Sequence, residues 1–132
     1  MKLQDLVDIK YPIIQGGMAN IATGEFAAAV SNAGGLGLIA SGGMDHTRIK
    51  EEIRNGVKTS LEDLKGKIPG LIDIRVQAEM LPTSNADVML DSTFESVEAL
   101  KGYATHKEHV KAADDFVRPY MEVRLCMDYE VK

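Results

Sequence analysis

Residues 87–110 have the sequence DVMLDSTFESVEALKGYATHKEHV, which predicts a strand followed directly by a helix. The alternation in residues 87–94 places Val88 and Leu90 on the inward face of a half-buried strand. Ser96 belongs to the residue types that favour the N-cap position, and an amphipathic helical pattern follows it. This strand and helix set the frame for the rest of the chain.

Two further strands flank this unit. Residues 71–78 alternate between apolar and polar side chains, and residues 123–131 do so even more regularly, which makes them the clearest predicted strand. A helical pattern precedes the first of these strands and stops at Pro69-Gly70, and a second helical piece stops at Pro119. The residues expected on one face of the first strand are Ile72, Ile74, Val76 and Ala78.

Three stretches of this half, LKGKIPGL, DVMLDSTFESVEALKGYATHKEHV and FVRPYMEVRLCMDYEV, resemble the stress-responsive α/β-barrel domain, often called Dabb. The resemblance covers about residues 60–131. It implies a ferredoxin-like β-α-β-β-α-β order, a sheet with strand order 4-1-3-2, and dimers whose sheets pack face to face. At the position where such a domain has its first, central strand, this chain has a sequence that does not resemble a Dabb domain.

The N-terminal half has a different pattern. Two short apolar runs, residues 11–15 (YPIIQ) and 36–40 (LGLIA), predict buried strands, and each is followed by a glycine turn and a helix. Thr23 and Asp45 are suitable N-caps for the two helices. A strand, helix, strand order implies parallel strands with a right-handed crossover.

The stretches YPIIQGGM and AAAVSNAGGLGLIAS resemble the N-terminus of nitronate monooxygenases and flavin-dependent enoyl-ACP reductases over about the first 55 residues. That resemblance implies an FMN-binding TIM barrel, with Gly16, Gly17 and Met18 against the flavin ring. Such a barrel needs about 250 residues, and its phosphate site comes from the loops after strands 7 and 8. Because tight turns also require double glycines, we expect no bound cofactor, with FMN as the alternative.

These observations predict one fold, an α/β (α+β) ferredoxin-like sandwich with a mainly antiparallel sheet. Residues 36–40 are expected to replace the missing central strand, between residues 87–94 and 123–131. Residues 11–15 would then lie beyond the last strand and complete a five-stranded sheet, or else the N-terminal segment is loosely attached or swapped. Asn55-Gly56 lies inside the fused helix and is expected to kink or break it.

We expect the chain to form a single hybrid domain over residues 1–132. A barrel-like fragment would occupy residues 1–55, and a Dabb-like body residues 56–132. We interpret it as an engineered or recombined chimera, or as a truncated fusion reading frame, and expect a folded module without intrinsic catalytic activity. The alternatives are a Dabb-type homodimer that binds a small hydrophobic ligand between its sheets, and a flavin-binding remnant.

Candidate catalytic residues come from the Dabb resemblance. Polyketide cyclases of that fold family use a tyrosine and a histidine in this second helical region, and the matching residues are Tyr103 and His109, with His106 nearby. The resemblance implies that His109 acts as general base and that Tyr103 orients the substrate. A surface histidine beside charged neighbours is usually only solvated, so no catalysis is expected from this pair.

The amino-acid composition limits the kinds of molecule that this chain is expected to bind. A net charge of −5, scattered lysines and arginines, no tryptophan, four tyrosines and three phenylalanines argue against nucleic acid. No apolar run reaches the ~20 residues that a transmembrane helix needs, and no metal site is expected. The single cysteine, Cys126, favours a reducing cytoplasm and is expected to pack in an interface. The predicted partner is a second copy, bound through the sheet face opposite the helices.

Overall fold

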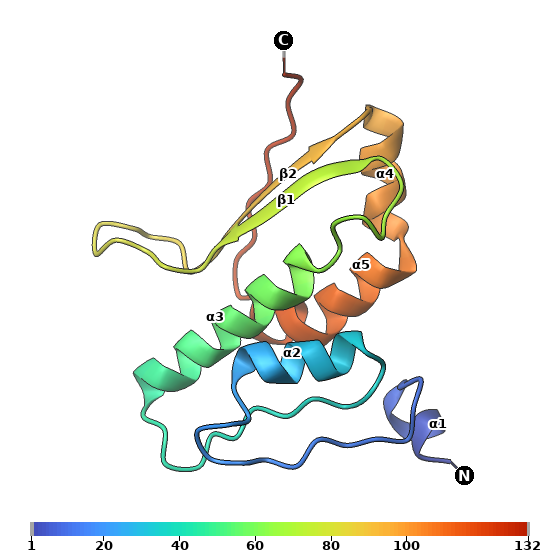
Figure 1. Ribbon diagram of the computed structural model, residues 1–132. Coiled ribbons are helices and arrows are strands. Elements are labelled where there is room, and N and C mark those ends of the chain that lie inside the picture. Colours follow the sequence, from blue (N-terminus) through green and yellow to red (C-terminus); the bar gives the residue numbers. More distant parts are fainter. Residues whose placement is uncertain (1, 132) are drawn as a thin grey trace.

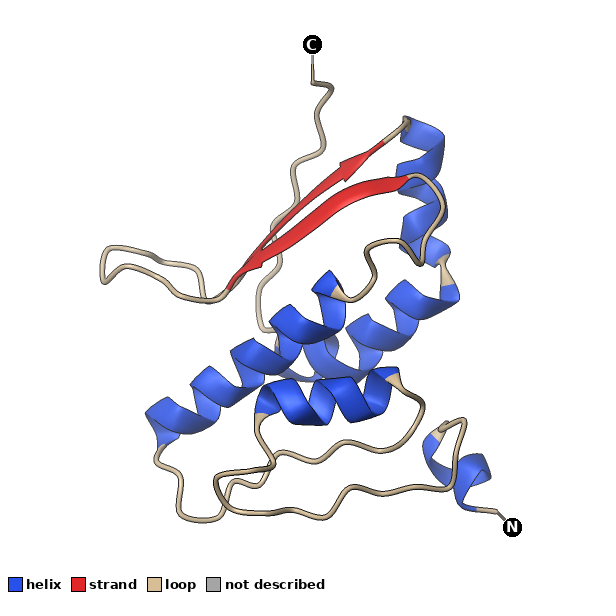
Figure 2. Ribbon diagram, in the orientation of Figure 1, coloured by secondary structure: helices blue, strands red, loops and turns tan. Residues whose placement is uncertain are grey.

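The computed structural model describes residues 2–131 and contains a layer of helices beneath a short two-stranded sheet (Figures 1 and 2). A C-terminal segment, residues 121–131, leaves this body without regular secondary structure. The elements in chain order are α1 (Leu3–Val7), α2 (Gly24–Asn32), α3 (His46–Glu62), β1 (Leu71–Gln77), β2 (Met89–Phe94), α4 (Val97–Thr105), α5 (Lys107–Ala112), a π-helical turn (Ala113–Val117) and a 3-10 turn (Arg118–Tyr120).

Strands β1 and β2 form an antiparallel pair, with Val76 opposite Leu90 and Ile74 opposite Ser92. The register shifts between Leu71 and Asp73, so one extra residue of β1 has no partner there. This bulge buries Leu71 and turns Ile72 outward, to 52% exposure. The predicted inward face is therefore confirmed at Ile74 and Val76 and wrong at Ile72.

The predicted N-caps are confirmed. The Thr23 hydroxyl accepts a hydrogen bond from the backbone N–H of Phe26 at 3.2 Å. The Asp45 carboxylate accepts one from the Arg48 N–H at 2.8 Å. Ser96 caps α4 in the same way, through the Ala99 N–H at 3.1 Å. Each cap satisfies a backbone donor that the first turn of a helix leaves without a partner.

Helix α3 is continuous through Asn55-Gly56, so the expected break there is wrong. Gly56 is buried where α3 crosses α2, and a Cβ placed on it would lie 3.3 Å from the Gly24 carbonyl oxygen. At the same crossing a Cβ on Gly24 would lie 1.6 Å from the Glu52 carbonyl oxygen. The glycine permits close contact between the helices, and that packing stabilises α3 despite its low helix propensity there.

One hydrophobic core holds the helices and the sheet together. It includes Ala28 of α2, so the N-terminal helix packs into the same core as the elements that follow it. The buried members are Ala28, Val57, Leu61, Leu64, Ile68, Leu71, Ile74, Val76, Tyr103, Ala112 and Phe116. Because this cluster spans α2 to the π-helical turn, residues of both halves depend on each other for burial.

The two N-terminal apolar runs do not join the sheet. Residues 11–15 and 36–40 lie side by side and make a single parallel bridge, Ile14 to Leu36, so their predicted parallel direction is confirmed, although they were expected to be separated by another strand. The predicted placement of 36–40 between β2 and residues 123–131 is wrong, as is the pairing of 11–15 with residues 123–131. A Cβ on Gly37 would lie 1.9 Å from the Ala27 carbonyl oxygen, so residues 36–40 are held against α2 instead.

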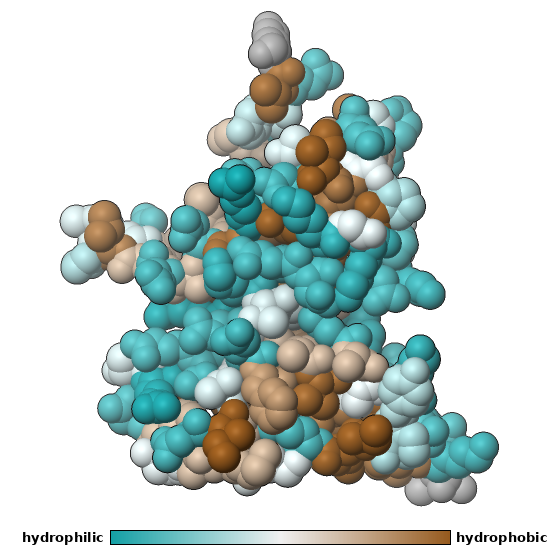
Figure 3. All heavy atoms as spheres, in the orientation of Figure 1, coloured by the Kyte–Doolittle hydropathy of each residue, from teal (hydrophilic) through white to brown (hydrophobic). Residues whose placement is uncertain are grey.

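The outer side of these N-terminal segments is apolar. Figure 3 shows hydrophobic side chains gathered over this end of the molecule. Ile13 and Ile21 are each 59% exposed, and Phe26 is 41% exposed. In a complete (β/α)₈ barrel, neighbouring strands and helices would cover such side chains.

The C-terminal segment forms no strand within the described residues, although it was the clearest predicted one. The alternation is present, but the central strand that should pair with it is absent from the sheet. The sheet therefore has two strands rather than five, and β2 has a strand partner along only one of its edges. The exposed apolar side chains of this segment include Val123 (77%), Leu125 (93%), Met127 (84%), Tyr129 (76%) and Val131 (81%).

Candidate functional site

The structure brings together Tyr103 and His109, the two residues predicted as catalytic candidates. Tyr103 lies on α4 and His109 on α5, and their ring centroids are 4.1 Å apart with the planes inclined by 32°. Phe94, at the end of β2, also packs against Tyr103, with ring centroids 5.0 Å apart and planes inclined by 58°. The three rings form an aromatic cluster between the helices and the end of β2.

Tyr103 is buried, at 6% exposure, and its hydroxyl has no hydrogen-bond partner among the described residues. Burial raises the pKa of this phenol to about 12, although the positive charge of Arg124 acts in the opposite direction. The hydroxyl therefore stays protonated at neutral pH. It cannot act as a base there, and because its oxygen is buried, a ligand does not reach it directly.

Burial also lowers the pKa of His109, because the half-buried ring is less able to carry charge. The hydrogen bonds that the ring makes to the carbonyls of Ala104 and Tyr103 act against this shift, and the charges of Arg118 and Arg124 add to it. Nδ1 lies 3.3 Å from the Ala104 carbonyl oxygen, an acceptor only, so Nδ1 carries the proton in that contact. Nε2 is then left as an acceptor in a neutral imidazole.

The pair lacks the geometry of a proton relay. His109 stacks on the Tyr103 ring, and the Tyr103 hydroxyl forms no hydrogen bond with any described residue. No proton therefore passes directly between the two side chains. His106 has a structural role, since its Nδ1 accepts a hydrogen bond from the Glu108 N–H at 3.3 Å and caps α5. The arrangement is a packed aromatic cluster, and it offers no direct path for proton transfer in bond cleavage.

The residues matched to the flavin turn lie apart from this cluster, in the loop between residues 15 and 22. A Cβ on Gly16 would meet nothing within 4 Å, and Met18 is 42% exposed. The N-terminus of α2 is a possible anion site, but it already has an anion, because the Gly24 N–H donates to the Glu52 carboxylate at 2.8 Å. Asp45 occupies the N-terminus of α3 in the same manner. Both helix N-termini of this unit are therefore already occupied by carboxylates.

Two buried polar residues of the N-terminal unit had no signal in the sequence. Gln15 is 8% exposed, and its side-chain amide donates to the Leu38 carbonyl at 3.1 Å, which holds residues 11–15 and 36–40 together. Glu52, also 8% exposed, binds Gly24 from 28 positions away. Both contacts depend on the tertiary arrangement, so no local pattern could have indicated them.

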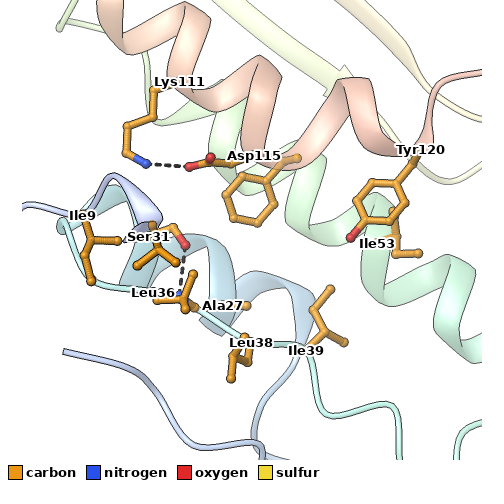
Figure 4. A pocket seen from close by; sticks show the side chains of 14 residues that line it. Ile9, Ala27, Ser31, Leu36, Leu38, Ile39, Ile53, Lys111, Asp115 and Tyr120 are labelled. Atoms are coloured by element: carbon orange, nitrogen blue, oxygen red, sulfur yellow. Dashed lines mark hydrogen bonds and ion pairs between the residues drawn. The ribbon is translucent and has the colours of Figure 1, made fainter. Parts of the chain in front are cut away.

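A cavity of about 290 Å³ lies between the N-terminal segments and the helices (Figure 4). Its lining is mainly apolar and includes Ile9, Ala27, Leu36, Leu38, Ile39, Ile53 and Phe116. The Lys111 ammonium pairs with the Asp115 carboxylate at 2.5 Å along one wall, and the Gly37 N–H donates to the Ser31 hydroxyl at 3.1 Å on the other side. The volume is near the lower limit of small-molecule sites.

Other kinds of site find no support in the part of the chain that the structure describes. Over residues 2–131, no group of three histidine, cysteine or acidic side chains could hold a metal ion. In the same range, no helix is long and apolar enough to cross a membrane.

Comparison with known proteins identifies the C-terminal two thirds of the chain. Residues 45–131 match the Stress responsive A/B Barrel Domain, Dabb, and the match begins at the N-cap of α3. A crystal structure of a dimeric protein of unknown function and ferredoxin-like fold, from Bacteroides fragilis, superposes with a TM-score of 0.60 at 32% identity. The superposition covers 67% of this chain and 84% of that one. The ferredoxin-like α+β class with an antiparallel sheet is thereby confirmed.

The resemblance to the flavin family is confirmed in part. A probable nitronate monooxygenase of Staphylococcus saprophyticus is 40% identical over 80 residues, which are 61% of this chain and 21% of that protein. A probable nitronate monooxygenase of Staphylococcus aureus strain JH9 is 44% identical over 52 residues, 39% of this chain and 15% of that protein. The chain thus spans about a fifth of the length of the first relative and less of the second.

Proposed function

Because the chain belongs to the stress-responsive A/B barrel (Dabb) family, we propose that it acts as a homodimerising module without catalytic chemistry of its own. The observation that carries this proposal is the row of large apolar side chains along the C-terminal segment, which are between 76% and 93% exposed from Val123 to Val131. A contiguous exposed row of this kind is typical of an interaction surface. The dimeric state of the Bacteroides fragilis protein supports the same assembly.

The outer face of the sheet is a second surface suited to this dimer. Ile72 and Met89 are exposed there, at 52% and 56%, and Arg75, which forms an ion pair with Asp73, lies opposite Asp91 in the ladder. Apolar anchors beside paired charges are typical of protein interfaces. This is the face away from the helices, through which the Dabb resemblance implies that two sheets pack together.

We also propose that the chain is a chimera, in which barrel-like sequence precedes the Dabb-like body as a result of recombination or design. The partial identity to nitronate monooxygenases supports this origin. The carboxylates at the N-termini of α2 and α3 support an expectation that no FMN binds. The single exposed thiol of Cys126 favours a reducing cytoplasm.

Sedimentation equilibrium from low to high micromolar concentration tests the dimer. We expect a mass of twice 14.4 kDa at the higher concentrations. Leu125→Asp places a charge in the exposed row and should shift the equilibrium to monomer. Leu81→Asp is the matched control, because Leu81 is also exposed (76%) but lies in the loop between β1 and β2. A chain that stays at 14.4 kDa throughout contradicts the proposal.

A second candidate function is the binding of a small apolar ligand, favoured by the cavity between the N-terminal segments and the helices. Its volume of about 290 Å³ suits a single ring or a short alkyl chain. Indole should then raise the thermal unfolding midpoint in a saturable manner, and Leu38→Phe, which fills part of the cavity from its half-exposed rim, should abolish that shift. No shift with the unaltered chain contradicts this candidate.

A further inference from the structure

We propose that two copies exchange their C-terminal segments, so that residues 121–131 of each chain pair as an antiparallel strand with the free edge of β2 in the other. This inference rests on the proposed homodimer and specifies which surfaces form it. It gives a partner to two features that have none in the described part of the single chain. They are the second edge of β2 and the C-terminal segment, in which apolar and polar residues alternate.

The free edge of β2 is the first of these features. Strand β2 is bonded to β1 along one edge, and no strand within residues 2–131 pairs with the other. In the ferredoxin-like order, the first strand of the domain would lie at that edge. Its backbone N–H and C=O groups form a template for an added strand, the arrangement used in β-strand addition.

The segment of the same chain predicted for this position is held elsewhere. Leu36 is bridged to Ile14, and the Leu38 carbonyl accepts a hydrogen bond from the Gln15 side chain at 3.1 Å. The Gly37 N–H donates to the Ser31 hydroxyl at 3.1 Å. Filling the edge of β2 with residues 36–40 would break these contacts and open the α2 packing, so the edge is left free for a strand from elsewhere.

The C-terminal segment of the same chain also does not fit. It runs in the same general direction as β2, toward the C-terminus at the top of Figure 1, so it could pair with its own β2 only in parallel. A copy related by a two-fold axis perpendicular to the strands presents the segment in the opposite direction. Antiparallel pairing then results, as in the β1–β2 ladder.

Charge selects one register for this pairing. With Arg124 opposite Asp91, the outer face carries the alternating row Arg75, Asp91, Arg124, because Arg75 already faces Asp91 in the β1–β2 ladder. Shifting the segment by two residues keeps its apolar face inward but brings Glu122 opposite Asp91 in one direction, or Glu122 opposite Glu95 in the other. Both alternatives place like charges together.

The same register aligns the apolar faces. Leu125 lies opposite Leu90, and Met121 lies opposite Phe94. Leu90 is 40% exposed in the single chain, and Phe94 packs against the core while only partly buried. The added strand would therefore extend the existing core sideways and cover both partners.

One like-charge pair remains in this register, Asp128 opposite Asp87. Asp87 is compensated within its own chain, because the Arg54 guanidinium forms an ion pair with its carboxylate. Since each copy gives one segment and receives one, the assembly closes as a two-fold dimer and leaves no free segment to propagate a fibre.

Cysteine cross-linking tests the register. In the proposed pairing Cys126 lies opposite Met89 of the second copy, and both side chains are exposed. Met89→Cys should give a covalent dimer with the native Cys126 under mild oxidation, because opposed residues in adjacent strands bring their Cβ atoms within disulfide range. Met89→Cys/Cys126→Ser and Thr93→Cys are the matched controls and should remain mostly uncross-linked.

Three results would overturn the exchange. They are equal cross-linking of Met89→Cys and Thr93→Cys, efficient Cys126–Cys126 cross-linking of the unaltered chain, and a sedimenting dimer in which Met89→Cys does not cross-link. In all three the homodimer itself survives, whereas a chain that sediments only as monomer removes the proposed function too.

A charge variant gives a second, independent measurement. Arg124→Asp should weaken the dimer by at least about tenfold, because it places a like charge opposite Asp91. Arg124→Lys should retain it. Glu130→Arg is the control for a charge change beyond the end of β2, and it should have a smaller effect. Equal dissociation constants for Arg124→Asp and the unaltered chain contradict the register.

Discussion

Alanine in place of Gly24 is predicted to force α2 and α3 apart at their crossing. The new Cβ would lie 1.6 Å from the Glu52 carbonyl oxygen and 2.6 Å from its carbon, both backbone atoms that cannot rotate away. Ordinary contact begins at 3.4 Å, so the backbones must separate by about 2 Å. Overpacking of a tight contact costs about 1–3 kcal/mol.

A second loss adds to this cost. The Gly24 N–H donates to the Glu52 carboxylate at 2.8 Å, and separation of the helices breaks that bond. A hydrogen bond to a charged group contributes about 1.5–3 kcal/mol. The total, about 3 kcal/mol or more, is a large share of the free energy of unfolding of a domain this small.

Urea unfolding followed by circular dichroism measures this effect. Gly102→Ala is the matched control, because Gly102 lies inside α4 and a Cβ there meets nothing within 4 Å. Alanine should stabilise that helix by up to about 1 kcal/mol. If Gly24→Ala unfolds at the same urea concentration as the unaltered chain, α2 is not packed on α3 and the N-terminal half is not part of one cooperative domain.

Three further predictions concern the candidate sites. Tyr103→Phe should raise the free energy of unfolding by about 1 kcal/mol, since it removes a buried hydroxyl without a partner; a marked loss of stability in urea would reveal a partner for that hydroxyl. Folding lowers the pKa of His109, so the unfolded chain binds its proton more readily and stability should decline as the pH falls below 6.5. His109→Gln should lessen that decline, and urea midpoints that change equally with pH in both proteins would contradict the assignment. FMN fluorescence should show no saturable quenching by the chain; micromolar binding would mean that the chain provides a phosphate site despite the Glu52 carboxylate at the N-terminus of α2.

Local chemistry predicted much of the secondary structure. Thr23, Asp45 and Ser96 were identified as caps because an oxygen side chain precedes each amphipathic run, and all three accept the expected N–H. The strands at residues 71–77 and 89–94 followed from alternation. The Dabb resemblance singled out Tyr103 and His109 as candidates, but it did not predict that their rings stack.

Tertiary placement could not be predicted in the same way. Residues 36–40 form an apolar run that suits any buried position, and the close approach of Gly37 to Ala27 decides where they lie. The alternation of residues 123–131 was recognised correctly, but a strand also needs a neighbour. The bulge after Leu71 reverses the side of a single residue, Ile72, which a period of two cannot indicate.

Amide hydrogen exchange of residues 121–131, measured over a range of protein concentration, tests the strand exchange most closely. Protection of alternate amides in this segment should rise with concentration in step with dimer mass, because only a second copy supplies their acceptors. Exchange that stays rapid while the mass doubles would contradict the proposed pairing. Protection already present in the monomer would contradict it too, since the segment would then be paired within its own chain.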